Sequence, residues 1–263
     1  GSSGNNRQMI KIEGVSWLST LQPDLLEDRS VQITLTEKNC HSYTVTLQGL
    51  NKIDGWQEFA KASMTIVTPE VKKLDLDLIR KELKPAEKGI LKEKAGEKQQ
   101  VHVSERWDCR KQIWYSEDRQ HILASLELDQ KYSDDLNSLD WHPAMLDVAV
   151  SLALDKPGLI PVSCREIRLY KPHRIKCYSY IVIDDTNDKN GKSVKADCMV
   201  LDTDGTVAAE FIDMFFIQAS APAPRIHRLS WRKALTETVS RQEIRIEKIM
   251  ILEDVSNATL SIE

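Results

Sequence analysis

Most of the chain consists of stretches in which β-branched and aromatic residues alternate with polar ones, as in half-buried β-strands. In the first part, this pattern predicts a four-strand antiparallel meander at residues 10–18, 31–38, 42–49 and 56–67. Six further strands are predicted at residues 111–118, 121–129, 157–170, 174–184, 192–202 and 206–218. Asn-Gly within residues 184–192 and Asp-Gly at 204–205 favour hairpin turns between the last three strands.

Two segments have helical patterns instead. The stretch LDLDLIRKEL, residues 74–83, predicts a short helix that Pro85 ends. The stretch HPAMLDVAVSLAL, residues 142–154, is apolar on almost every side, which predicts a buried helix. Pro143 suits its first turn, and Asp140 is a candidate cap. Its one carboxylate, Asp147, must find a partner, take up a proton or do chemistry.

The same patterns divide the chain into segments. Residues 1–4, GSSG, resemble an expression-tag remnant and are set aside. Residues 5–100 form a first half that ends in the charged linker 69–100, and residues 101–220 form a second half built around the helix at 142–154. Each half is expected to be an antiparallel sheet of about four strands. The Pro-broken stretch 221–225 opens a new segment, 221–263.

Composition excludes several classes of function. The net charge is -4 with dispersed Lys and Arg, so nucleic acid is not an expected partner. The apolar runs are too short to span a membrane and no signal peptide is visible, so we expect a cytoplasmic chain. The five cysteines form no C-x-x-C or Cys/His cluster, and no Gly-rich phosphate loop occurs. Free thiols and no tightly bound metal or nucleotide are therefore expected.

The helical stretch and its flanks resemble a known family. LDWHPAMLDVAVSLAL is similar to L-H-P-A-L-L-D-A-x-x-Q, the second active-site motif of dehydratase domains from modular polyketide synthases. The matching residues are His142, Pro143, Ala144, Leu146 and Asp147. LIPVSCREIRLY and ADCMVLDTDGTVAAEFIDMFF also resemble family segments, and the likeness covers roughly residues 8–218. LSWRKA, at 229–234, is similar to the segment that leads into the structural part of a ketoreductase.

The resemblance implies an α+β double hotdog, in which two antiparallel sheets each wrap a central helix, the first incomplete at its N-terminus. Such domains remove water from a β-hydroxyacyl thioester carried on the phosphopantetheine arm of an acyl carrier protein. A His takes the α-proton and an Asp protonates the leaving hydroxyl. Neighbouring ketosynthase and ketoreductase domains and a homodimer are implied as partners. No tightly bound cofactor is implied.

By this resemblance, Asp147 is the candidate catalytic acid. The candidate residues that line or support its site are His142, Pro143, Ser151, Pro161 and Val162. We expect desolvation to raise the pKa of Asp147. The alternative is an Asp paired with a buried amide or a loop backbone. His142 precedes the helix and is expected to be structural or capping rather than the base.

The chain departs from the family at three places. The base motif H-x-x-x-G-x-x-x-x-P is missing, and the segment Y-G-P-x-F is replaced by ERWDCRKQ. The Gln or His four residues after the Asp is Ser151, which lies one helical turn on and has a shorter reach. The acid motif is therefore present without its base. Dehydration, a non-standard reaction (double-bond isomerisation, oxa-cyclisation or β-branching) and a catalytically degenerate dimerising scaffold all remain open.

The sequence allows more than one structural role for the other candidate residues. Trp107, Trp114 and Trp141 either line an acyl tunnel or pack in the core, which is the usual place for aromatic residues in strands. The charge run at 72–98 either docks a carrier protein or is a solvated linker. The remaining histidines are each isolated and are expected to be solvated or hydrogen-bonded within the structure; they are His41, His102, His121, His173 and His227.

Overall fold

The computed structural model describes most of the region with strand and helix patterns. The described residues are 9–19, 26–51, 55–86, 105–152, 159–184, 193–218, 228–233 and 248–253. The Asn-Gly turn in 184–192, the Pro-broken stretch 221–225 and two histidines, His102 and His227, lie outside these ranges.

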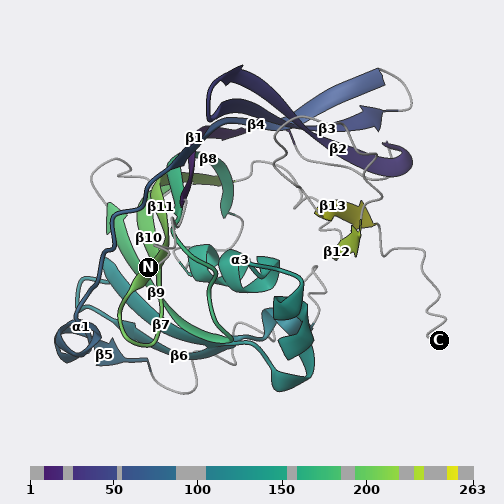
Figure 1. Ribbon diagram of the computed structural model, residues 1–263. Coiled ribbons are helices and arrows are strands. Elements are labelled where there is room, and N and C mark those ends of the chain that lie inside the picture. The colour runs from purple at the N-terminus through teal and green to yellow at the C-terminus, as the bar shows by residue number, and fades with distance from the viewer. Residues whose placement is uncertain are drawn as a thin grey trace, which may run out of the picture.

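The described residues form an antiparallel sheet with few helices (Figure 1). The strands of the large sheet are β1 (Met9–Trp17), β2 (Leu26–Asn39), β3 (Ser42–Asn51), β4 (Gly55–Val67), β5 (Lys84–Pro85), β6 (Arg110–Tyr115), β7 (His121–Glu127), β8 (Leu159–Leu169), β9 (Lys176–Asp184), β10 (Ser193–Leu201) and β11 (Val207–Gln218). The helices are α1 (Leu76–Glu82) and α3 (Pro143–Ser151), with 3₁₀ segments η2 (Glu105–Trp107) and η3 (Gln130–Asn137). All the strand and helix patterns read from the sequence up to residue 218 thus correspond to elements.

The strand order corrects one prediction. Eleven strands join into one sheet in the order β2-β3-β4-β1-β8-β11-β10-β9-β7-β6-β5. Only β2, β3 and β4 form the predicted meander, because β1 pairs with β4 on one side and with β8 on the other. Alternation of polar and apolar residues fixes which face of a strand is buried, but it does not choose the neighbouring strand. Through β1, the first group of strands becomes continuous with the second.

Helix α3 lies against the concave side of the second group of strands (Figure 1). Met145 and Ala149 are almost completely buried, and the helix packs on β7, β9 and β10. The carbonyl of Ala149 accepts a hydrogen bond of 2.8 Å from the buried hydroxyl of Ser179. The predicted hotdog-type α+β fold is confirmed, and α3 is its central helix in the described residues. None of the described helices has the length and apolar character needed to cross a bilayer.

The charged segment after β4 is not a solvated linker where the structure describes it. Residues 69–86 cross to the outer face of the second group of strands, where Leu76 and Leu83 are buried. Asp75 caps α1 by accepting from the backbone N–H groups of Asp77 and Leu78. The segment therefore packs its apolar residues on the sheet, while charged residues such as Lys73 and Asp77 stay exposed.

A tight turn holds that crossing segment in place. The turn between β10 and β11 contains the predicted Asp-Gly, and Gly205 has a φ of 85°. Its carbonyl accepts a 2.9 Å hydrogen bond from the backbone N–H of Leu74. A Cβ at Gly205 would lie 2.1 Å from the carbonyl oxygen of Leu74. The turn therefore requires glycine for its conformation and for this close approach.

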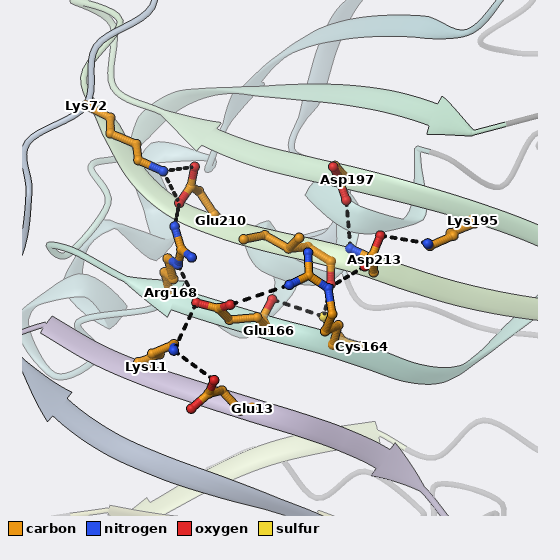
Figure 2. A network of polar contacts seen from close by, with 12 residues as sticks. Lys11, Glu13, Lys72, Cys164, Glu166, Arg168, Lys195, Asp197, Glu210 and Asp213 are labelled. Carbon is orange, nitrogen blue, oxygen red and sulfur yellow. Dashed lines mark hydrogen bonds and ion pairs between the residues drawn. The ribbon is translucent and has the colours of Figure 1, made fainter.

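A network of ion pairs fills the outer face beside this segment (Figure 2). Glu166 on β8 and Glu210 on β11 are about as buried as the surrounding apolar residues, at 5% and 6% exposure. The guanidinium of Arg168 bonds the carboxylate of Glu166 and lies 3.4 Å from that of Glu210. Lys72 of the crossing segment donates to Glu210 at 2.9 Å, and Lys11 of β1 lies 3.7 Å from Glu166. Arg168 is thus the cation that the two buried carboxylates share.

A separate two-stranded sheet, β12 (Arg228–Lys233) with β13 (Lys248–Glu253), follows the main sheet in the chain. It begins within the segment predicted to be new, 221–263, and β13 lies beside β2.

The Gly205 contact gives the first prediction. We expect Gly205→Ala to lower the free energy of unfolding by about 3 kcal/mol, because the methyl group meets the Leu74 carbonyl in a left-handed backbone conformation. Gly55→Ala is the matched control, since Gly55 also has a positive φ, 76°, with nothing within 4 Å of a Cβ. It should lose only ~1 kcal/mol. Equal losses in urea unfolding would show that the Leu74 contact is unimportant.

The shared cation gives a second prediction. We expect Arg168→Met to destabilise the fold by ~2 kcal/mol at pH 7, because two buried carboxylates lose a partner that is itself partly exposed. Arg168 lowers the pKa of Glu166, so this stabilisation is present at neutral pH and is lost as the pH falls through the folded pKa. The deficit should therefore shrink in urea unfolding below pH ~4.

Arg165→Met is the comparison for that experiment, because Arg165 is exposed, bonds Asp213 and lies farther from the Glu166 carboxylate, at 3.8 Å. It should cost less than ~1 kcal/mol. A deficit for Arg168→Met that stays constant with pH would argue against a role in neutralising Glu166.

Candidate active site

The start of helix α3 confirms the prediction for Pro143 but not the predicted cap. His142 occupies the N-cap position and Pro143 the first turn, but no side chain caps the helix, so the prediction of Asp140 as cap is wrong. The backbone N–H of His142 instead donates to Nε2 of His173, at 2.8 Å. Nδ1 of His173 lies 3.0 Å from the carbonyl of Arg174. His173 is therefore a buried ring with both nitrogens hydrogen-bonded.

The ring of His142 is buried at 1% exposure beside the helix start. Its Nε2 lies 3.2 Å from Oδ2 of Asp135 in η3. Desolvation lowers the pKa of His142, and the contact with Asp135 opposes this only in part. A neutral ring with hydrogen on Nε2 fits these contacts. Its Nδ1 has no hydrogen-bond partner among the described residues.

Asp147 lies on the side of α3 that the strands leave open, and its side chain is exposed. Oδ2 of its carboxyl accepts a hydrogen bond of 2.7 Å from Nε1 of Trp107, the last residue of η2. The surrounding protein raises the pKa of Asp147 by desolvation, and the bond from Trp107 acts in the opposite direction. Because the side chain keeps surface open to solvent, this is a partly desolvated carboxyl that a substrate can still approach.

The two residues of η2 that precede Trp107 hold this turn in place through side-chain contacts. Arg106 donates to Oδ2 of Asp135 at 2.7 Å, and its guanidinium lies 4.2 Å from the ring centre of Tyr132. Glu105 pairs with Lys131 and accepts from the hydroxyl of Tyr132 at 3.2 Å. These contacts fix the backbone that carries the Trp107 indole.

Ser151 does not bond the carboxylate. Its hydroxyl donates to the carbonyl of Val148 at 3.2 Å, within its own helix. Pro161 and Val162 lie in β8, which is not one of the strands that α3 packs on most closely. Pro161 is exposed and faces Phe216 at a β-bulge. The contacts among the described residues therefore bring Trp107, rather than the predicted supporting residues, to Asp147.

For Trp107, as for the two other tryptophans, the sequence allowed either an acyl-tunnel position or packing in the core. Neither interpretation included a hydrogen bond from its indole N–H. Trp114 packs on the outer face, with the guanidinium of Arg80 5.7 Å from its ring centre. Trp141 packs against the core around α3 and edge-on to His173. The one signal in the sequence that pointed to Trp107 is its position in ERWDCRKQ, where the chain departs from the family pattern.

The core around α3 also contains cysteine thiols. All five cysteines are free, and four of them are buried. Burial raises the pKa of Cys109 and of Cys198 to about 12, so neither is a thiolate at neutral pH. Within the described ranges, no three His, Cys, Asp or Glu side chains gather in a way that could hold a metal ion.

Comparison with known proteins places this geometry in context. Residues 97–225 match the family model described as polyketide synthase dehydratase N-terminal domain. A search of curated proteins found no match.

Several solved structures are similar in fold. The dehydratase domain of RzxB from Pseudomonas fluorescens is 14% identical with a TM-score of 0.67, covering 80% of this chain and 76% of that one. The dehydratase domain from the CurF module of Curacin polyketide synthase is 18% identical with a TM-score of 0.66, covering 80% and 76%. That from the CurK module is 17% identical with a TM-score of 0.67, covering 82% and 78%. Variants of the CurK dehydratase with a His replaced by Phe, or an Asp by Asn, are described as inactive.

These structural similarities establish the fold, and the family match covers the segment that holds α3, Trp107 and Asp147. The resemblance seen in the sequence is therefore confirmed: over residues 97–225 this chain matches the polyketide synthase dehydratase family, and it has the fold of those domains.

Proposed function

We propose that this chain is a dehydratase-like domain of a polyketide synthase, acting on β-hydroxyacyl or enoyl thioesters carried on an acyl carrier protein. The observation that carries the proposal is Asp147, a carboxyl with a raised pKa and accessible surface on the central helix, within the segment that matches the family. The phosphopantetheine arm presents the substrate, and ketosynthase and ketoreductase domains and a homodimer are the partners proposed with it.

Asp147 has the properties that a general acid needs. An acid must hold its proton at the working pH and release it to the leaving hydroxyl, which a carboxyl with a raised pKa does better than an ordinary one. Activity that depends on this proton falls as the pH rises through the pKa of Asp147, since the carboxylate form has nothing to donate.

The lack of a histidine in contact with Asp147 among the described residues favours a second candidate function. His142 bonds Asp135, His173 accepts from His142, and His121 lies 2.9 Å from the hydroxyl of Tyr180. His41 is exposed in the turn between β2 and β3. No contact among the described residues joins any of these rings to Asp147. We therefore also propose that the chain acts best on enoyl or pre-branched thioesters, by isomerisation, cyclisation or branching.

The third prediction separates these functions. A carrier protein loaded with a β-hydroxyacyl chain is incubated with this protein and followed by intact-mass analysis for the loss of one water. We expect loss to be slower by ~10²–10⁴ than in a dehydratase with both groups, because one of the two proton-transfer groups is missing. An enoyl substrate should change faster, and Asp147→Asn should abolish either reaction.

Asp140→Asn is the matched control, because Asp140 is an exposed carboxylate just before the same helix. It should leave the rates unchanged. Rapid loss of water that Asp147→Asn abolishes would show a complete dehydratase and reject the second candidate. Turnover that survives Asp147→Asn would reject the proposed role of Asp147. Turnover of no substrate would reject it as well and would favour a scaffold.

A further inference from the structure

We propose that Trp107 is a positioning residue for Asp147, whose indole N–H holds Oδ2 as the carbonyl oxygen of the acid and so leaves the proton on Oδ1. This inference rests on the proposed function, because it assigns which oxygen of Asp147 delivers the proton.

The chemistry of the two groups supports this assignment. An indole N–H can only donate, so the oxygen that faces it must accept. A protonated carboxyl has one accepting carbonyl oxygen and one O–H, and the 2.7 Å contact is with Oδ2. The donated proton therefore resides on Oδ1. The distance is at the short end for N–H···O bonds, so the same bond is well placed to stabilise the carboxylate that remains after the proton has left.

The surroundings hold both partners of this bond on one frame. Arg106, the residue before Trp107, donates to Asp135 at 2.7 Å. The same oxygen of Asp135 lies 3.2 Å from Nε2 of His142, the residue at which α3 begins. The turn that carries Trp107 and the helix that carries Asp147 are thus joined through a single carboxylate. A donor fixed in this way loses little freedom when the substrate arrives.

Trp107 also fills a role that the helix itself leaves open. Ser151, at the position of the family's Gln or His, gives its hydrogen to Val148. Trp107 comes from a different part of the chain, within ERWDCRKQ, the segment that departs from the family pattern. The helix thus offers no side-chain donor to the Asp147 carboxyl at position 151, and η2 supplies one instead.

The bond to Trp107 matters most as the proton leaves. The O–H bond at Oδ1 breaks, the proton passes to the substrate hydroxyl, and the C–O bond breaks with its electrons going to the departing water. A general base, an imidazole or water, takes the α-proton, and the electron pair of the broken C–H bond forms the C=C double bond. Negative charge develops on the carboxyl of Asp147, and a hydrogen bond that is already in place stabilises it more than it stabilises the neutral acid.

Few other ionisable groups of the described residues face this carboxyl. The thiol of Cys109 is close enough to interact with the charge of Asp147, and burial raises the pKa of this thiol to about 12. On η2, Arg106 is bonded to Asp135, and at the helix start His142 is bonded to the same residue. Loss of burial would move the titration of Asp147 to lower pH, whereas loss of the Trp107 N–H would move it to higher pH, so the direction of the change identifies the hydrogen bond.

The test compares Trp107→Phe with Trp114→Phe, which removes an indole that packs on the outer face of the sheet. The titration of the Asp147 carboxyl is read by carbon-13 NMR, and kcat/KM for the Asp147-dependent reaction is measured against pH. The Trp107 bond lowers the pKa of Asp147, so Trp107→Phe should move the carboxyl titration and the basic limb of kcat/KM to higher pH. Turnover should fall by ~10-fold, the value of one hydrogen bond to a charged group. Trp114→Phe should change none of these.

A second measurement needs no change at Trp107. In the unaltered chain, the nitrogen-15 resonance of the Trp107 indole should titrate together with Asp147, and this titration should vanish in Asp147→Asn. An indole resonance that ignores pH, or an Asp147 titration that is the same in Trp107→Phe, would overturn the inference. Coupled titrations in a chain that turns over no thioester would instead overturn the proposed function while the hydrogen bond stands.

Discussion

The structure depends on the burial of one apolar helix against one curved sheet. Helix α3 packs on β7, β9 and β10 and buries Met145 and Ala149. Burial of a side chain as large as that of Met145 contributes ~1.5–3 kcal/mol to stability. This packing orders the strands around it. It also leaves a single strip of the helix uncovered, and the only carboxylate of the helix lies on that strip. The constraint that makes the core therefore also presents Asp147.

Most polar groups near α3 hold the structure together, and one keeps surface that solvent can reach. Asp135, His142 and His173 bond one another, or nearby backbone, around the start of the helix and connect it to η2. Asp147 accepts one hydrogen bond, from Trp107, and keeps accessible surface. On the opposite face of the sheet, buried carboxylates are neutralised by cations instead. Carboxylates are thus held by cations on the outer face, whereas Asp147 accepts its hydrogen bond from an uncharged indole.

Much of this could be predicted from the sequence. Alternation of polar and apolar residues gave each strand of the large sheet except the two-residue β5, and the apolar stretch with Pro143 gave α3, because these signals are local. The place of β1 between β4 and β8 depends on long-range pairing, which alternation does not encode. The bond between Trp107 and Asp147 joins residues 40 positions apart, in a segment without a regular pattern, so no spacing could reveal it.

The central claim is that Asp147 delivers a proton to the substrate hydroxyl through Oδ1. The most direct measurement is a crystal structure of the Asp147→Asn variant with a β-hydroxyacyl pantetheine thioester bound. The account predicts the hydroxyl within ~2.6–3.2 Å of the side-chain atom at position 147 that Trp107 does not contact. A thioester bound with its hydroxyl away from this side chain, or on the Trp107 side of it, would contradict the account.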